Sequence, residues 1–299
     1  MNQQQSICSQ AREKTRAKRA ATQVFSFLTL RAAAFVNCAA LVIACVFLFV
    51  NGIGALNIDF VLDSPREMMT SGGVFPCLVG TFLLAAGAIA IALPFGVACA
   101  VWLNEYGKQG PVVDIVRLSV ANLAGVPSIV FGLFGLAFFV TALGFNVSLL
   151  SGILTLAVLT LPVIINTTEG ALKQVPRSWR DASLALGATK SQTIGRIVLP
   201  SALPGILTGA ILAVARAAGE TSAVMFTAAV FYTPKLPESV WSSVMALPYH
   251  MYVLATAGTE IEKTRPMQYG TGLLLVVLVF AMNLIAILIR DKMQKKRLA

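Results

Sequence analysis

The chain has 299 residues, of which 57% are hydrophobic and only 12% are charged. This composition excludes an ordinary soluble domain, because several apolar runs reach the ~20 residues that cross a bilayer as a helix. The net charge of +10 and the five cysteines define no further class, since the cysteines show neither metal-ligand nor disulfide spacing. The sequence therefore predicts an all-α, polytopic membrane protein.

Six transmembrane helices are expected within a domain that covers residues 32–290. Their approximate limits are residues 32–50, 78–103, 128–143, 149–166, 202–224 and 269–289. The second span contains Pro94, and Gly125-Val126-Pro127-Ser128 separates the third from a short approach helix. Polar residues 231–267 form the longest connection on the outer side, and basic tails are expected at residues 1–31 and 291–299.

The distribution of Lys and Arg predicts the orientation of these spans. Six spans place both termini on one side, and 18 of the 23 Lys and Arg residues lie on that side. Since cytoplasmic segments of membrane proteins are enriched in Lys and Arg, both termini are expected in the cytoplasm. The basic N-terminal tail is interpreted as an orientation signal in preference to a nucleic-acid-binding arm.

The polar connection between the fourth and fifth spans is patterned as a helix–turn–helix. Pro176 suits the first turn of a helix, and Gly187 is well placed as the left-handed residue that ends it. Thr189 and Gln192 form a capping box for a second helix, which Pro200 is expected to stop. Membrane spans tether both ends of this segment, which argues against a DNA-binding helix–turn–helix.

This segment resembles the EAA loop of permease subunits of ATP-binding-cassette (ABC) importers. In that loop Glu-Ala-Ala is followed by three residues, Gly, nine residues and Ile-x-Leu-Pro. The matching residues are Asp181, Ala182, Ser183, Gly187, Ile197, Leu199 and Pro200, with Asp181 and Ser183 departing from the pattern. The resemblance implies a type I importer permease in which residues 168–200, with Arg177 and Arg180, form a loop that couples to a separate ATPase.

The fifth span carries two charges that a bilayer disfavours. Gly205 and Gly209 form a GxxxG pair, which permits close helix packing. On one helix, Arg216 and Glu220 would share this face with them, one turn apart. Arg216 could attract an oxyanion in transit while Glu220 holds it, or the two could form a structural ion pair at a subunit interface.

A wider resemblance covers about residues 70–290. The chain is similar to the PstA-type permeases of the bacterial phosphate-specific (Pst) ABC importers in the stretches Gly72–Pro76, Asn122–Val140, Thr160–Leu212, Ala215–Ala229 and Met245–Pro248. The resemblance implies import of inorganic phosphate across the bacterial inner membrane. It also implies a PstC-like permease partner, a homodimeric ATPase that binds ATP and Mg, and a periplasmic phosphate-binding protein. Arg216 and Glu220 become candidates for the translocation path.

No ATPase site of its own is expected in this chain. The run Gly187-Ala188-Thr189-Lys190-Ser191 lacks the Gly that precedes Lys in a phosphate-binding loop. Alternatives are a permease for another oxyanion or a phosphonate, the PstC-like partner itself, or a non-translocating scaffold coupled to an ATPase. The only histidine, His250, is expected near the outer surface beside Tyr249, either as a titrating group at the mouth or as an ordinary interfacial residue.

Overall fold

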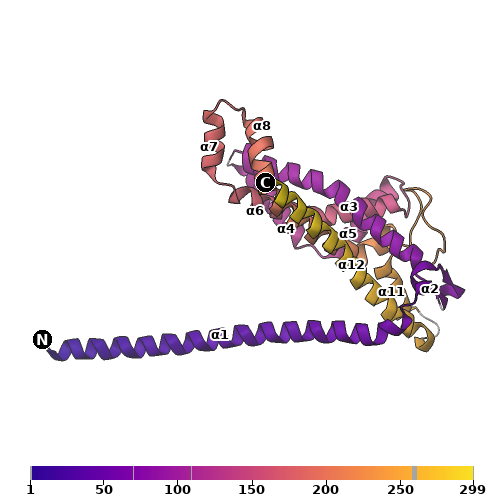
Figure 1. The fold of residues 1–299 in the computed structure, drawn as a ribbon, viewed down its shortest axis with the longest axis horizontal. Coiled ribbons are helices and arrows are strands. Elements are labelled where there is room, and N and C mark those ends of the chain that lie inside the picture. Colours follow the sequence, from indigo (N-terminus) through magenta and orange to yellow (C-terminus); the bar gives the residue numbers. More distant parts are fainter. Residues whose placement is uncertain (1, 70, 109, 258–260, 299) are drawn as a thin grey trace. The chain divides into compact units, whose positions relative to one another are not determined.

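The computed structural model describes residues 2–69, 71–108, 110–257 and 261–298, which are predominantly helical (Figure 1). They form two compact units, Met1–Asn51 and Gly52–Ala299. The described part of the first unit belongs to helix α1 (Asn2–Gly52), which continues the first predicted span into the basic tail. The predicted all-α membrane fold is confirmed.

The second unit begins with a small region of short elements. This region contains η1 (Ile53–Ala55), α2 (Ile58–Leu62), β1 (Pro65–Arg66), η2 (Glu67–Met69) and β2 (Ser71–Gly72), in which β1 and β2 pair antiparallel. The helices that follow are α3 (Phe75–Val101), η3 (Trp102–Tyr106), α4 (Pro111–Ala124), α5 (Ser128–Gly135), η4 (Leu136–Ala142), α6 (Leu149–Gln174), α7 (Arg177–Ala185), α8 (Lys190–Thr193), η5 (Ile194–Val198), α9 (Leu199–Ala218), α10 (Ser222–Thr227), α11 (Leu247–Thr256) and α12 (Ile261–Leu298).

Five helical segments in the described chain are long and apolar enough to cross a membrane. They are Ser26–Ala55, Phe75–Tyr106, Leu149–Gln174, Lys190–Ala218 and Thr264–Met293. A sixth results if Pro111–Ala124 and Ser128–Ala142, which meet at 103°, count as one broken span. The break falls at the predicted site, because Pro127 disfavours a helical conformation in the residue before it.

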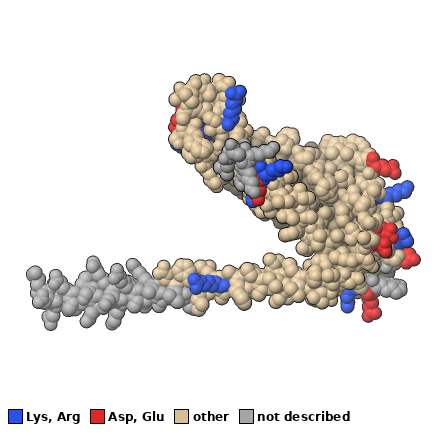
Figure 2. Space-filling model, in the orientation of Figure 1, with Lys and Arg blue, Asp and Glu red and all other residues tan. Residues whose placement is uncertain are grey.

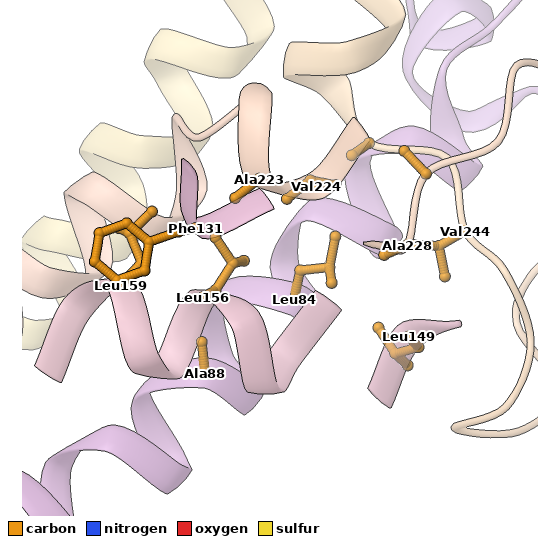
Figure 3. Packing of buried hydrophobic residues seen from close by; sticks show 12 residues of the cluster. Leu84, Ala88, Phe131, Leu149, Leu156, Leu159, Ala223, Val224, Ala228 and Val244 are labelled. Carbon is orange, nitrogen blue, oxygen red and sulfur yellow. The ribbon is translucent and has the colours of Figure 1, made fainter. Parts of the chain in front are cut away.

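Helix α6 is the centre of the second unit and packs against α3 and α9. One apolar cluster joins it to three other helices, with Leu84 from α3, Phe131 from α5, Leu156 from α6 and Val224 from α10 (Figure 3). Lipid tails are as apolar as these side chains, so dense packing rather than exclusion of water stabilises such contacts within a membrane.

Helix α3 approaches the backbone of a distant segment closely at Gly80. A Cβ at this position would overlap the carbonyl oxygen of Met245. One residue further on, Thr81 Oγ1 accepts a 2.8 Å hydrogen bond from the backbone N–H of Leu247, at the start of α11. The predicted polar connection 231–267 therefore contains a helix docked on α3, which its turn-rich composition did not indicate.

Two predicted helix limits are wrong. The fifth span does not continue to Val224, because α9 ends at Ala218 and α10 starts only at Ser222. Pro200 does not stop the preceding helix either, since helical structure is continuous from Lys190 to Ala218. A π-helical turn, η5, precedes Pro200, and the proline occupies the first turn of α9, where a missing N–H costs little.

Charged side chains mark the two ends of the second unit. Helices α7 and α8 project from one end, and α2 and α11 lie at the opposite end (Figure 1). On the face shown in Figure 2, Lys, Arg, Asp and Glu side chains gather toward these ends, with an uncharged surface between them. This distribution fits a body that sits across a bilayer, where charge is costly.

Candidate functional site

The segment between α6 and α9 folds as the predicted helix–turn–helix. Gly187 has a φ of +83° and follows Leu186, the C-cap residue of α7. The N–H groups of Ala188 and Gly187 bond to the carbonyls of Ser183 and Leu184 at 3.2 and 3.0 Å, which is a Schellman ending. The capping box is also confirmed, because Thr189 and Gln192 exchange both side-chain-to-backbone hydrogen bonds.

We expect Gly187→Ala to weaken the end of α7 by about 1 kcal/mol, because a side chain at positive φ is strained. No atom lies within 4 Å of the added Cβ, so the cost comes from the backbone alone. Hydrogen exchange at the Gly187 and Ala188 amides measures it. Gly195→Ala is the matched control, since Gly195 is also open but helical, and there alanine should stabilise. Equal effects of both changes would contradict the strain argument.

The Ser183 side chain explains one departure from the EAA pattern. Ser183 is buried, and its hydroxyl lies 2.9 Å from that of Thr193. This hydrogen bond joins α7 to α8 across the turn. A serine in place of the usual alanine therefore has a partner inside the segment, whereas Ala182 and Asp181 on the same helix are exposed.

Arg180 is held by a residue that sequence analysis did not single out. Its Nη2 and Nε lie 2.7 and 3.3 Å from the carboxylate oxygens of Glu105 in η3. Its Nη1 and Nη2 also donate to the carbonyls of Val175 and Leu172 at 2.6 and 3.0 Å. Glu105 stands out in the sequence only as an acidic residue at the end of an apolar run. Because 75 positions separate it from Arg180, no local pattern predicts that the two residues meet.

The remaining residues of the predicted loop lie in η5 and in the first turn of α9. Ile197, Leu199 and Pro200 are half-buried, and Leu199 packs against the cluster formed by α3, α4, α6 and α9. Thus the second half of the EAA-like pattern anchors the segment in the helical body. The first half, on α7, is largely exposed.

The predicted GxxxG pair packs α9 on α6. A Cβ at Gly209 would overlap Thr167 Oγ1, and one at Gly205 would lie 2.5 Å from Ala171 Cβ. The close approach that the motif predicts is therefore confirmed, and its partner is a helix of the same chain.

The predicted common face of Arg216 and Glu220 is wrong. Arg216 is in the last turn of α9, whereas Glu220 lies in the break before α10. Gly219 is the C-cap residue of α9. Both side chains are half-buried, and among the described residues no carboxylate forms an ion pair with Arg216. The structural ion pair considered from the sequence is not formed.

The sequence patterns also gave no indication of a second buried carboxylate, that of Glu169. Glu169 near the end of α6 has a side chain only 10% exposed, and its Oε1 lies 3.0 Å from Arg117 and 2.8 Å from Lys173. Arg117 comes from α4, so this cluster ties the broken helix pair to α6. A buried carboxylate between two cations is a stabilising arrangement for a charge that would otherwise be costly.

His250 is not at the surface beside Tyr249, as the sequence suggested. It is 1% exposed in α11, and its Nδ1 lies 3.5 Å from Thr271 Oγ1 of α12. Burial lowers the pKa of His250 from 6.5 to about 4, so the ring is neutral near pH 7.

Because the unfolded chain takes up a proton near pH 6.5 and the folded chain only near pH 4, we expect stability to fall as the pH drops through this window. The loss at pH 4 should reach about 3 kcal/mol. Thermal unfolding of the detergent-solubilised protein between pH 7 and pH 4 measures it, with His250→Gln as the variant that lacks this dependence. An equally steep decline in the variant would assign the pH effect to other groups.

A predominantly helical body with five to six possible spans and a projecting helix–turn–helix between two of them is the architecture of a polytopic membrane protein. The chain belongs to the family described as binding-protein-dependent transport system inner membrane component, which matches residues 92–298. Members of this family are multi-pass inner-membrane subunits of ABC importers, which associate with a separate ATPase and a binding protein.

Relatives and solved structures agree with this family. The chain is 39% identical over 228 residues to phosphate transport system permease protein PstA 1 of Mycobacterium tuberculosis, covering 76% of this chain and 73% of the relative. It is 33% identical over 266 residues to probable ABC transporter permease protein YqgI of Bacillus subtilis, covering 83% and 90%. The fold is similar to that of the MetNI methionine ABC transporter in an inward-facing conformation, with a TM-score of 0.54 at 23% identity and coverage of 74% and 94%.

Proposed function

We propose that the chain is the PstA-like permease subunit of a phosphate importer and that Arg216 lies on the translocation path. The observation that carries the substrate assignment is the guanidinium of Arg216, half-buried at the end of a membrane span and, within the described chain, paired with no carboxylate. A guanidinium matches phosphate oxygens in charge and geometry. Relatives that are named PstA support the same substrate.

Glu220 has a separate role in this proposal. It lies in the break between α9 and α10, four residues after Arg216, and is half-buried. A carboxylate near the path would weaken the hold of Arg216 on a bound anion by repulsion and so permit release. The two residues would then act in sequence on the anion, without pairing with one another.

The coupling role is proposed for residues 168–200 and above all for α7. This helix exposes large apolar side chains at Trp179 and Leu184, and Leu186 follows at 89% exposure. Arg177 and Asp181 are exposed on the same helix. An apolar surface with charges beside it suits a groove on a partner protein, here a homodimeric ATPase that holds ATP and Mg.

In the proposed arrangement both termini lie in the cytoplasm, on the same side as α7. The basic tails 1–31 and 291–299 precede and follow the membrane domain 32–290 in the sequence. A PstC-like permease would complete the path. A periplasmic phosphate-binding protein would dock at the end that carries α2 and α11. ATP-driven closure of the ATPase pair would move α7, and the spans would change from outward to inward access.

Radiolabelled phosphate uptake tests this proposal in cells that lack the native permease and contain the cognate partner subunits. Uptake that depends on this chain is the expected result. If a membrane-assembled complex imports sulfate or a phosphonate but no phosphate, the substrate assignment is wrong. If it hydrolyses ATP and imports none of these anions, the chain is a scaffold rather than a permease.

A further inference from the structure

Three elements meet at the guanidinium of Arg180. The group belongs to α7, it forms a two-point ion pair with Glu105 at the end of the second span, and it donates to the carbonyls of Leu172 and Val175 at the end of α6. The last carbonyls of a helix have no partner within the helix and carry partial negative charge. The guanidinium of Arg180 therefore provides hydrogen-bond donors for the carbonyls at the end of α6, and the carboxylate of Glu105 in η3 neutralises its charge.

Burial makes this ion pair consequential. The side chains of Arg180 and Glu105 are only 17% and 8% exposed. A buried charge that loses its partner is strongly destabilised, whereas exposed pairs contribute little. By comparison, Arg66 and Asp63 in the loop at the opposite end pair with 67% and 46% exposure. The Glu105–Arg180 pair is the kind whose loss has a measurable effect.

Apolar packing does not replace this link. The contacts of α7 are mainly with α8 and η5, the two helices that follow it in the chain. Between α7 and the ends of α3 and α6 lies an open, polar cavity of about 280 Å³, lined by Asn104, Glu105, Lys173, Val175, Arg177, Arg180 and Asp181. Across this cavity the two helix ends are joined to α7 by hydrogen bonds and charge.

We propose that Glu105 and Arg180 are positioning residues that transmit movement of α7 to α3 and α6. This inference rests on the proposed coupling role of α7 but not on the identity of the substrate. A link of two parallel bonds resists rotation as well as separation, so displacement of α7 is carried into both spans. Without Glu105 the helix still docks on the ATPase through its exposed surface, but its movement is no longer carried into the second span.

The test compares Glu105→Gln with Asp291→Asn in the complete complex, reconstituted in liposomes with its ATPase, the second permease and phosphate-loaded binding protein. Asp291 is the matched control, because it also pairs with an arginine, but one that is its immediate neighbour on α12. For Glu105→Gln we expect ATP hydrolysis to persist while phosphate imported per ATP falls about tenfold. The control should match the wild-type chain.

A second readout does not depend on the substrate. Hydrogen exchange of the α7 amides in the same complex should become about tenfold faster in Glu105→Gln and stay unchanged in Asp291→Asn. Because Glu105 acts through Arg180, a Glu105→Gln/Arg180→Gln double variant should couple no worse than Arg180→Gln alone. Arg180→Lys, which keeps the charge but loses the fork, should fall between wild type and Arg180→Gln.

Unchanged transport per ATP together with unchanged α7 exchange in Glu105→Gln would overturn the inference. Additive losses in the double variant would also overturn it, since the two residues would then act independently. A wild-type complex that imports no phosphate would instead refute the proposed substrate, and the exchange measurement would still decide the inference.

Discussion

Replacing Arg216 by Gln is expected to reduce phosphate uptake about 100-fold while leaving membrane levels and ATPase association unchanged, which corresponds to a barrier about 2.7 kcal/mol higher. Arg216 is half-buried at the end of α9, and no ion pair with a described carboxylate consumes its charge. Glutamine keeps much of the side chain but removes the positive potential that favours an anion in a low-dielectric path. Radiolabelled uptake, normalised to the amount of assembled complex, measures the effect.

Arg216→Lys separates charge from shape. Lysine retains the cation without the planar fork, so partial uptake is expected if the field of the charge matters most. An alternative role for Arg216 is to stabilise the carbonyl end of α9, where a cation is favourable by about 0.3–1 kcal/mol. Under that alternative the Gln variant would assemble less well but transport normally per complex. Such a result would remove Arg216 from the path.

A second large effect is expected for Gly209→Leu, which should prevent normal packing of α9 on α6 and cost about 3 kcal/mol or more. Already a Cβ at Gly209 would overlap Thr167 Oγ1. Thr167 cannot easily turn away, because it is β-branched and its hydroxyl bonds to the carbonyls of Val163 and Ile164 at 2.8 and 3.1 Å. Thermal unfolding of the solubilised chain and its level in the membrane measure the loss.

Gly170→Leu is the matched control for this change. Gly170 is on α6, is exposed, and has no atom within 4 Å of an added Cβ. It should tolerate leucine, which is also a better helix former. Adding Thr167→Ala to Gly209→Leu should recover part of the stability by making room. If Gly209→Leu and Gly170→Leu behave alike, the close approach of α9 and α6 is not what stabilises the pair.

The two predictions differ in how far the sequence anticipated them. The GxxxG spacing indicated close helix packing, and the structure adds that its partner is Thr167 and Ala171 of α6. The charge of Arg216 within an apolar run indicated a special position. Its supposed pairing with Glu220 assumed a continuous helix, and that assumption failed at Gly219, where α9 ends.

The helix–turn–helix formed by α7 and α8 shows the same division. Two features of this segment are local: the capping box of Thr189 and Gln192, and the left-handed Gly187. Because each involves residues only a few positions apart, the sequence predicts both. The prediction that Pro200 stops the helix failed because a π-helical turn before it lets the helix continue. No short-range sequence pattern indicated that turn. The ion pair of Arg180 with Glu105 joins residues 75 positions apart.

The sequence alone determined the membrane class, five of the spans, the break before Ser128 and the helix–turn–helix, because hydropathy, proline and capping chemistry act over a turn or two of helix. Only the tertiary structure decided which buried charges meet, that Arg180 links α7 to two spans, and that His250 of α11 is buried against α12. Such contacts depend on how distant helices pack, since burial turns an ordinary acidic or imidazole side chain into one whose partner matters.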